Sequence, residues 1–97
     1  MDKFIYYNNL YDYYKDLFTD KQKMYFEDYY FNNLSLAEIG ENYGVSRNAV
    51  HNQLKIIENK LEEYEKILNL YEKKNKIIDI LSDKIDNSIM DKIKGII

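Results

Sequence analysis

Cysteine and proline are absent from this chain of 97 residues, and glycine occurs only three times. Without cysteine there can be no disulfide, no cysteine-bound zinc and no thiol nucleophile, so nothing in the chain requires an oxidising compartment. Long apolar runs are missing too: no stretch approaches the roughly 20 apolar residues of a membrane span, and the N-terminus has no run of signal-peptide length. We therefore expect a cytoplasmic protein that does not enter a membrane.

An excess of basic residues is also lacking. The formal net charge is −3 and the sequence pI is about 5.1, whereas a nucleic-acid-binding protein usually has a basic excess or a basic face. This balance argues against non-specific binding to DNA. The only guanidinium group belongs to Arg47, and this group can bind a guanine or a phosphate through two parallel hydrogen bonds. Arg47 either makes such a contact or pairs with a neighbouring carboxylate, and the sequence leaves both interpretations open.

Groups suited to catalysis are few. His51 is the only histidine. Ser46 is better explained as the N-cap of a helix, and a spacing of five residues does not bring its hydroxyl to His51. There is no glycine-rich phosphate loop and no calcium-binding loop, and the carboxylates alternate with lysines as they do on solvated helix faces. We expect neither an enzyme nor a bound metal ion or cofactor.

Aromatic residues are abundant in the first 43 residues, which hold nine of the eleven tyrosines and all four phenylalanines. They recur every three or four positions and predict a helix from about Lys3 to Phe18, followed by a second helix, about Asp20 to Asn32, that Thr19 and Gln22 cap. Such rings can stack on bases, but their helical spacing without interleaved basic residues favours core packing. The aromatic face of the first helix comprises Phe4, Tyr7, Tyr11, Tyr14 and Phe18.

A short helix and a longer one, joined by a tight turn, are predicted next. Ser35 and Glu38 have capping-box spacing, so a helix is expected from Leu36 to Tyr43. Gly44 can adopt the left-handed conformation that ends a helix, and Ser46 then caps the following one. This arrangement is typical of a helix-turn-helix, which we place at about residues 35–58.

The two faces of the second motif helix differ in character. Gly40 costs roughly 1 kcal/mol relative to alanine inside the preceding helix, which suggests close contact with Ala49 and Val50. The opposite face carries side chains of the types that bind base edges and phosphates. Because helix-turn-helix geometry also serves protein contacts, the pattern alone does not establish DNA binding. With the cap included, the candidate nucleic-acid-binding residues are Ser46, Arg47, Asn48, His51, Asn52 and Lys55.

A heptad pattern of apolar residues continues from the motif. This spacing predicts a helix of about 25 residues that packs along its length. We expect its early turns to pack against the helices that precede it, which together with its start form a four-helix head. A charge run at residues 72–76 is expected to end it, before a last helix from about Lys76 to Lys94. The stripe of heptad residues, which we call the seam, is covered either by a second copy of the chain or by that last helix. Of the two, we expect a homodimer. The predicted dimer residues are Ile57, Leu61, Tyr64, Leu68 and Tyr71.

The motif resembles the fourth region of sigma factors, and the stretch from about Asn9 to Lys73 resembles the YlxM family of small bacterial helix-turn-helix proteins. The matching segments are LYDYYKDLFTDKQKMYFEDYY, SLAEIGENYGVSRNAVHNQLK and LEEYEKILNLYEK. The resemblance implies an all-helical dimer with a link to the signal recognition particle pathway. Two features depart from such motifs: Gly40 replaces the usual alanine, and KIIENKL after Leu54 has fewer basic residues, which weakens the case for tight DNA binding.

The sequence thus predicts an all-α fold with a single domain over residues 1–97. A four-helix head contains the helix-turn-helix, and an extended helix and a C-terminal helix (about 55–97) form a dimer interface. Two functions remain open. The protein is either a regulator that binds DNA or structured RNA, or an accessory protein that contacts signal recognition particle protein or RNA through the same helices.

Overall fold

Every described element is helical in the computed structural model, which describes residues 2–97. No β-strand occurs among them, so the predicted all-α fold class is confirmed. None of these helices is both long and apolar enough to cross a bilayer. The elements are α1 (Lys3–Tyr14), the 3-10 helix η1 (Lys15–Leu17), α2 (Asp20–Tyr30), α3 (Leu36–Tyr43), α4 (Arg47–Leu68), α5 (Leu70–Leu81) and α6 (Asn87–Ile96).

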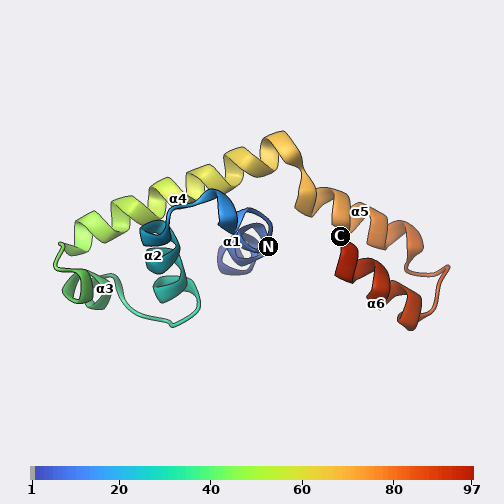
Figure 1. Cartoon of the computed structure of the whole chain (residues 1–97), viewed down its shortest axis with the longest axis horizontal. Coiled ribbons are helices and arrows are strands. Elements are labelled where there is room, and N and C mark those ends of the chain that lie inside the picture. Colours follow the sequence, from blue (N-terminus) through green and yellow to red (C-terminus); the bar gives the residue numbers. More distant parts are fainter. Residues whose placement is uncertain (1) are drawn as a thin grey trace.

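Helix α4, 22 residues long, organises the molecule, and the other helices lie on one side of it (Figure 1). Helix α3 packs against the start of α4, and α1 and α2 pack against its apolar seam. Helices α5 and α6 extend beyond its end as a hairpin, which gives the chain principal extents of 52 × 25 × 24 Å. The predicted head is therefore present, with α4 as its fourth helix.

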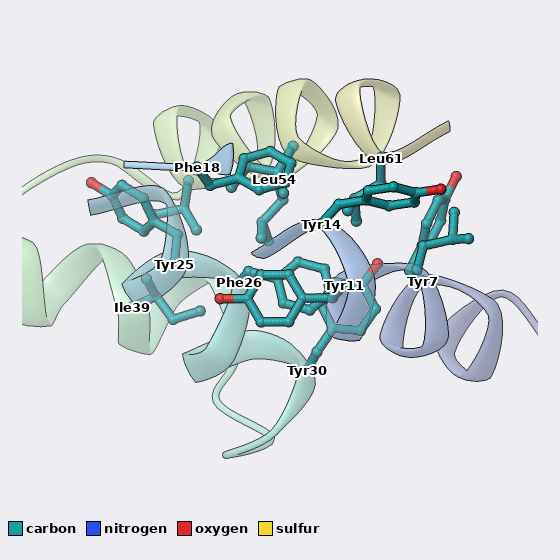
Figure 2. Close-up of a cluster of buried hydrophobic side chains, with 13 residues drawn as sticks. Tyr7, Tyr11, Tyr14, Phe18, Tyr25, Phe26, Tyr30, Ile39, Leu54 and Leu61 are labelled. Atoms are coloured by element: carbon teal, nitrogen blue, oxygen red, sulfur yellow. The ribbon is translucent and has the colours of Figure 1, made fainter. Parts of the chain in front are cut away.

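Aromatic side chains from α1 and α2 fill the core beneath α4 (Figure 2). Phe26 is fully buried and stacks between Tyr11 and Tyr30, with ring centroids 4.1 and 4.2 Å apart. Phe4, at the start of the predicted aromatic face, stays 37% exposed. Most rings of this face therefore pack in the core, where they are not accessible for stacking on bases. Its buried members are Tyr7, Tyr11, Tyr14 and Phe18.

The first two helices are shorter than predicted. Helix α1 ends at Tyr14 instead of Phe18, because η1 tightens the chain before the extended backbone at Phe18 and Thr19. Thr19 needs that extended conformation to cap α2, and its capping box with Gln22 is confirmed. Helix α2 ends at Tyr30 instead of Asn32.

The chain bends at Asn69, whose left-handed backbone (φ 55°) ends α4. The predicted break within residues 72–76 is therefore wrong. That charge run lies inside α5, where Lys76 pairs with Glu72 one turn away at 3.0 Å. Asparagine tolerates the left-handed region better than most residues with a side chain, so α4 can end here without a glycine.

Buried groups of the head cap α5, because the residue at the bend makes no side-chain capping bond. The carboxylate of Glu65 accepts hydrogen bonds from the backbone amides of Tyr71 (3.2 Å) and Glu72 (3.0 Å). The hydroxyl of Tyr14 donates to Glu65 (2.7 Å) and accepts from the amide of Leu70 (3.2 Å). These four bonds connect α1, α4 and the first turn of α5. We call Tyr14, Glu65 and residues 69–72 the joint.

The last part of the chain forms two helices, so the single helix predicted from Lys76 to Lys94 is wrong. Residues 82–86 form a turn, in which Asp86 caps α6 by accepting a hydrogen bond from the amide of Ile89 at 2.9 Å. Helix α6 packs against α5 and not on the seam of α4, which α1 and α2 already cover. The Tyr13 hydroxyl donates to the carbonyl of Ile97 at 2.7 Å and ties the end of α6 to α1.

Candidate nucleic-acid interface

Helix α3 and the start of α4 form the predicted helix-turn-helix. The Ser35–Glu38 capping box begins α3 with two hydrogen bonds of 3.1 Å. Gly44 ends the helix with φ 68°, in the left-handed region that favours glycine. Ser46 accepts a hydrogen bond from the amide of Ala49 at 3.0 Å and starts α4. The predicted caps and turn are confirmed.

Gly40 lets α3 approach the turn of the motif. A Cβ atom at this position would lie 2.6 Å from the carbonyl oxygen of Val45, and 3.3 to 3.4 Å from backbone atoms of Ser46 and Arg47. The close approach is confirmed, but its partner differs from the prediction. Gly40 meets the backbone of the turn and not primarily the side chains of Ala49 and Val50. The glycine thereby fixes where α4 begins.

The polar face at the start of α4 is open to solvent. The five polar side chains that follow the cap are all exposed, whereas Val50, Leu54 and Ile57 on the opposite face are buried. The hydroxyl of Ser46 serves as the cap. Arg47 makes no ion pair with any carboxylate of residues 2–97, so its pairing interpretation finds no support. The exposed set is Arg47, Asn48, His51, Asn52 and Lys55.

Carboxylates farther along α4 bond to tyrosines of the head. Glu58 accepts from the hydroxyl of Tyr30 at 2.7 Å, and Glu62 accepts from Tyr7 at 3.1 Å. Burial, followed by the bond to Glu62, raises the pKa of Tyr7 from its ordinary value of 10.0 to about 12. Sequence reasoning missed these pairs, which join residues 28 and 55 positions apart. The available signal was that Glu58, Glu62 and Glu65 flank the apolar seam.

A small pocket beside the exposed polar side chains of α4 has a volume of about 110 Å³, well below the roughly 300 Å³ at which small-molecule sites begin. Among residues 2–97, no three His, Asp or Glu side chains gather closely enough to hold a metal ion. The pocket is lined by Tyr29, Leu36, His51, Leu54, Lys55 and Glu58.

The structure divides the predicted dimer residues between core and surface. Ile57 and Leu61 are fully buried under α1 and α2, so they cannot contact a second copy while the head is folded. Tyr64 and Tyr71 are half-buried against the same core. Only Leu68, 42% exposed near the bend, presents a substantial apolar side chain to solvent. The assignment of Ile57 and Leu61 to an intermolecular contact is therefore corrected.

Known proteins resemble this chain over almost its whole length. The family model "Putative helix-turn-helix protein, YlxM / p13 like" matches residues 1–96. A UPF0122 protein of Halalkalibacterium halodurans is 42% identical over 89 residues, which cover 89% of this chain and 82% of the relative. A UPF0122 protein of a Geobacillus species is 41% identical over 96 residues, which cover 90% of this chain and 87% of the relative. A UPF0122 protein of Malacoplasma penetrans is 42% identical over 84 residues, which cover 87% of this chain and 78% of the relative.

Proposed function

Because the chain belongs to the YlxM / p13-like family of helix-turn-helix proteins, we propose that it is a DNA-binding regulatory protein that reads DNA with the start of α4. The family is described by this motif and not by an enzymatic activity. One observation carries the proposal: the polar side chains at the start of α4 are exposed on the face opposite the core. A recognition helix contacts bases through the same part of the helix.

The exposed residues divide into readers of bases and binders of phosphate. Arg47 carries the rigid two-pronged donor that matches guanine or a phosphate, and Asn48 and Asn52 can each donate and accept at an adenine edge. His51 lies between them. Lys55, near the end of the face, supplies charge to a phosphate without reading sequence. The backbone amides behind Ser46 and the positive end of the α4 dipole favour a phosphate near the helix start.

The charge of the molecule limits the affinity of a single copy. Beyond Lys55, the carboxylates of Glu58 and Glu62 lie within the next two turns of α4, and the chain as a whole carries a net charge of −3. We therefore propose that a homodimer engages two half-sites, with each copy contributing one recognition helix. Leu68 is the exposed member of the seam available for that contact. A cytoplasmic location belongs to the same proposal, since bacterial DNA lies there.

Substitutions on the recognition face test the proposal. Arg47→Ala should weaken binding to a preferred DNA site by about 1–3 kcal/mol, because it removes a base contact. Lys55→Ala should weaken binding to all DNA sequences alike, and it should reduce the slope of log affinity against log salt by about one unit. Binding is measured by fluorescence anisotropy over a salt series, with sites first selected from fragments of bacterial DNA. Lys84→Ala is the control, because Lys84 is exposed in the turn between α5 and α6.

The acidic balance of the chain favours a second candidate function, an accessory protein that contacts signal recognition particle protein or RNA through the same helices. The measurements therefore include that RNA and that protein beside DNA. A salt-dependent preference for the RNA assigns the face to structured RNA. If no nucleic acid binds even at low salt while the particle protein does, the DNA-binding proposal is wrong, and Arg47 and Lys55 become candidates for a protein contact.

A further inference from the structure

An apolar groove of about 400 Å³ lies where the C-terminal end of α6 returns to the start of α5 beside α1. We call it the hairpin groove. Its position is remote from the recognition face, because the start of α4 lies at the left end of the molecule in Figure 1, beyond α2 and α1. Its apolar walls come from three helices and the residue after α6. The lining residues are Tyr13, Leu70, Lys73, Lys74, Ile77, Ile96 and Ile97.

The groove is exposed although its walls are held in place. Leu70 is 40%, Ile77 is 38% and Ile96 is 85% exposed. The hydrogen bond from Tyr13 to the carbonyl of Ile97 fixes the end of α6 against α1, and the ammonium group of Lys74 lies 5.8 Å from the centre of the Tyr13 ring. Contiguous apolar surface of this kind, on a braced scaffold and rimmed by polar groups, is characteristic of an interaction site.

Two lysine side chains border the hairpin groove. Lys73 and Lys74 carry the only charged side chains among its lining residues, and neither makes an ion pair within residues 2–97. The neighbouring side of α5 differs, because there Glu72 and Lys76 neutralise one another. A local basic rim thus stands out on a chain whose net charge is −3. An apolar floor with such a rim complements apolar side chains flanked by carboxylates.

We propose that the hairpin groove binds an acidic amphipathic segment of another protein, with apolar side chains in the groove and carboxylates on Lys73 and Lys74. Helices that bind in grooves present apolar anchors one turn apart in this way. A second copy of this chain fits less well. A symmetric dimer contact places the same patch of both copies face to face, so the two lysine rims would oppose each other. This inference goes beyond the proposed nucleic-acid binding and does not depend on it.

Two synthetic helical peptides provide the probes. Both carry leucine and isoleucine anchors one turn apart, and the flanking positions are glutamate in one peptide and lysine in the other. Affinity is measured by fluorescence anisotropy at low salt, and the site is located from methyl NMR shifts of Leu70, Ile77 and Ile96. The full-length chain should bind the glutamate peptide about tenfold more tightly than the lysine peptide, with a difference that shrinks as salt rises.

A charge-reversal variant distinguishes this proposal from non-specific hydrophobic binding. Lys73→Glu changes an exposed side chain and should shift the preference toward the lysine peptide about tenfold. Ile77→Ser should weaken both peptides, whereas Leu68→Asp, outside the groove, should change neither. Equal affinity for the two peptides, or shifts away from the groove, would overturn the proposal. So would self-association that Ile77→Ser abolishes, because a second copy would then occupy the groove.

Discussion

Gly40 is the residue on which the angle of the helix-turn-helix depends. A Cβ there would lie 2.6 Å from the carbonyl oxygen of Val45, a backbone atom that can move only with the whole turn. Gly40→Leu should therefore destabilise the protein by about 1–3 kcal/mol through overpacking, although leucine favours a helix over glycine by close to 1 kcal/mol. Thermal unfolding followed by circular dichroism measures the change.

Gly95 supplies the control for this substitution. It also lies in a helix, α6, but a Cβ there would meet no atom within 4 Å. Gly95→Leu should leave the melting temperature unchanged or raise it. A higher melting temperature for Gly40→Leu would show that the turn yields and that α3 does not need the close approach.

Caps were the part of the structure that local sequence predicted best. Ser35 with Glu38, and Thr19 with Gln22, interact with backbone only three residues away, so spacing suffices to predict them. The tyrosine–carboxylate pairs are different. Tyr14 and Glu65 lie 51 positions apart in sequence, and only the packing of α1 on α4 brings them together. The exposure of the proposed recognition residues was predictable because it follows from one cap and one helical period.

The joint connects α5 to α1 and α4. Tyr14 is 1% exposed, and its hydroxyl serves both Glu65 and the amide of Leu70. Tyr14→Phe should cost about 1–3 kcal/mol, since it leaves a buried carboxylate short of a donor and an amide without an acceptor. Hydrogen exchange should accelerate most at the amides of residues 70–72, which form the first turn of α5.

Tyr43→Phe is the matched control for this substitution. Its hydroxyl also donates to a carboxylate, that of Asp28 at 2.6 Å, but both residues belong to the head. This variant should leave exchange in α5 unchanged. Equal acceleration in both variants would mean that the joint merely shares in global unfolding and does not hold α5 by itself.

The break between α4 and α5 could not be predicted from periodicity, because the apolar pattern continues across it. Leu68 and Tyr71 keep the heptad spacing, and the residue at the bend is neither glycine nor proline. The visible signal, the charge run at residues 72–76, lies inside α5 and includes an ordinary ion pair between Glu72 and Lys76. The bend depends on the hydrogen bonds that Glu65 and Tyr14 accept from the first amides of α5. These bonds form only in the tertiary structure, so the local sequence does not reveal them.

At the scale of the whole molecule, we propose a homodimer and treat residues 1–97 as one domain. Leu68→Asp should convert the dimer to monomers, since a carboxylate loses its hydration in an apolar contact. Multi-angle light scattering over a concentration series measures the mass. Lys66→Asp is the control, because it makes a larger change of charge at an exposed position of the same turn. A wild-type chain that stays monomeric at high micromolar concentration contradicts the dimer.

One uninterrupted helix carries the recognition face at one end and the joint at the other, and this continuity constrains the length of α4. Inserting one residue between His51 and Glu65 would turn the two ends relative to each other by about 100° and separate them by about 1.5 Å. Either the recognition residues would then rotate toward the core, or Glu65 would leave Tyr14 and the amides of α5. The number of residues between His51 and Glu65 is thus constrained by the rotation of the helix, independently of which residues occupy the exposed positions between them.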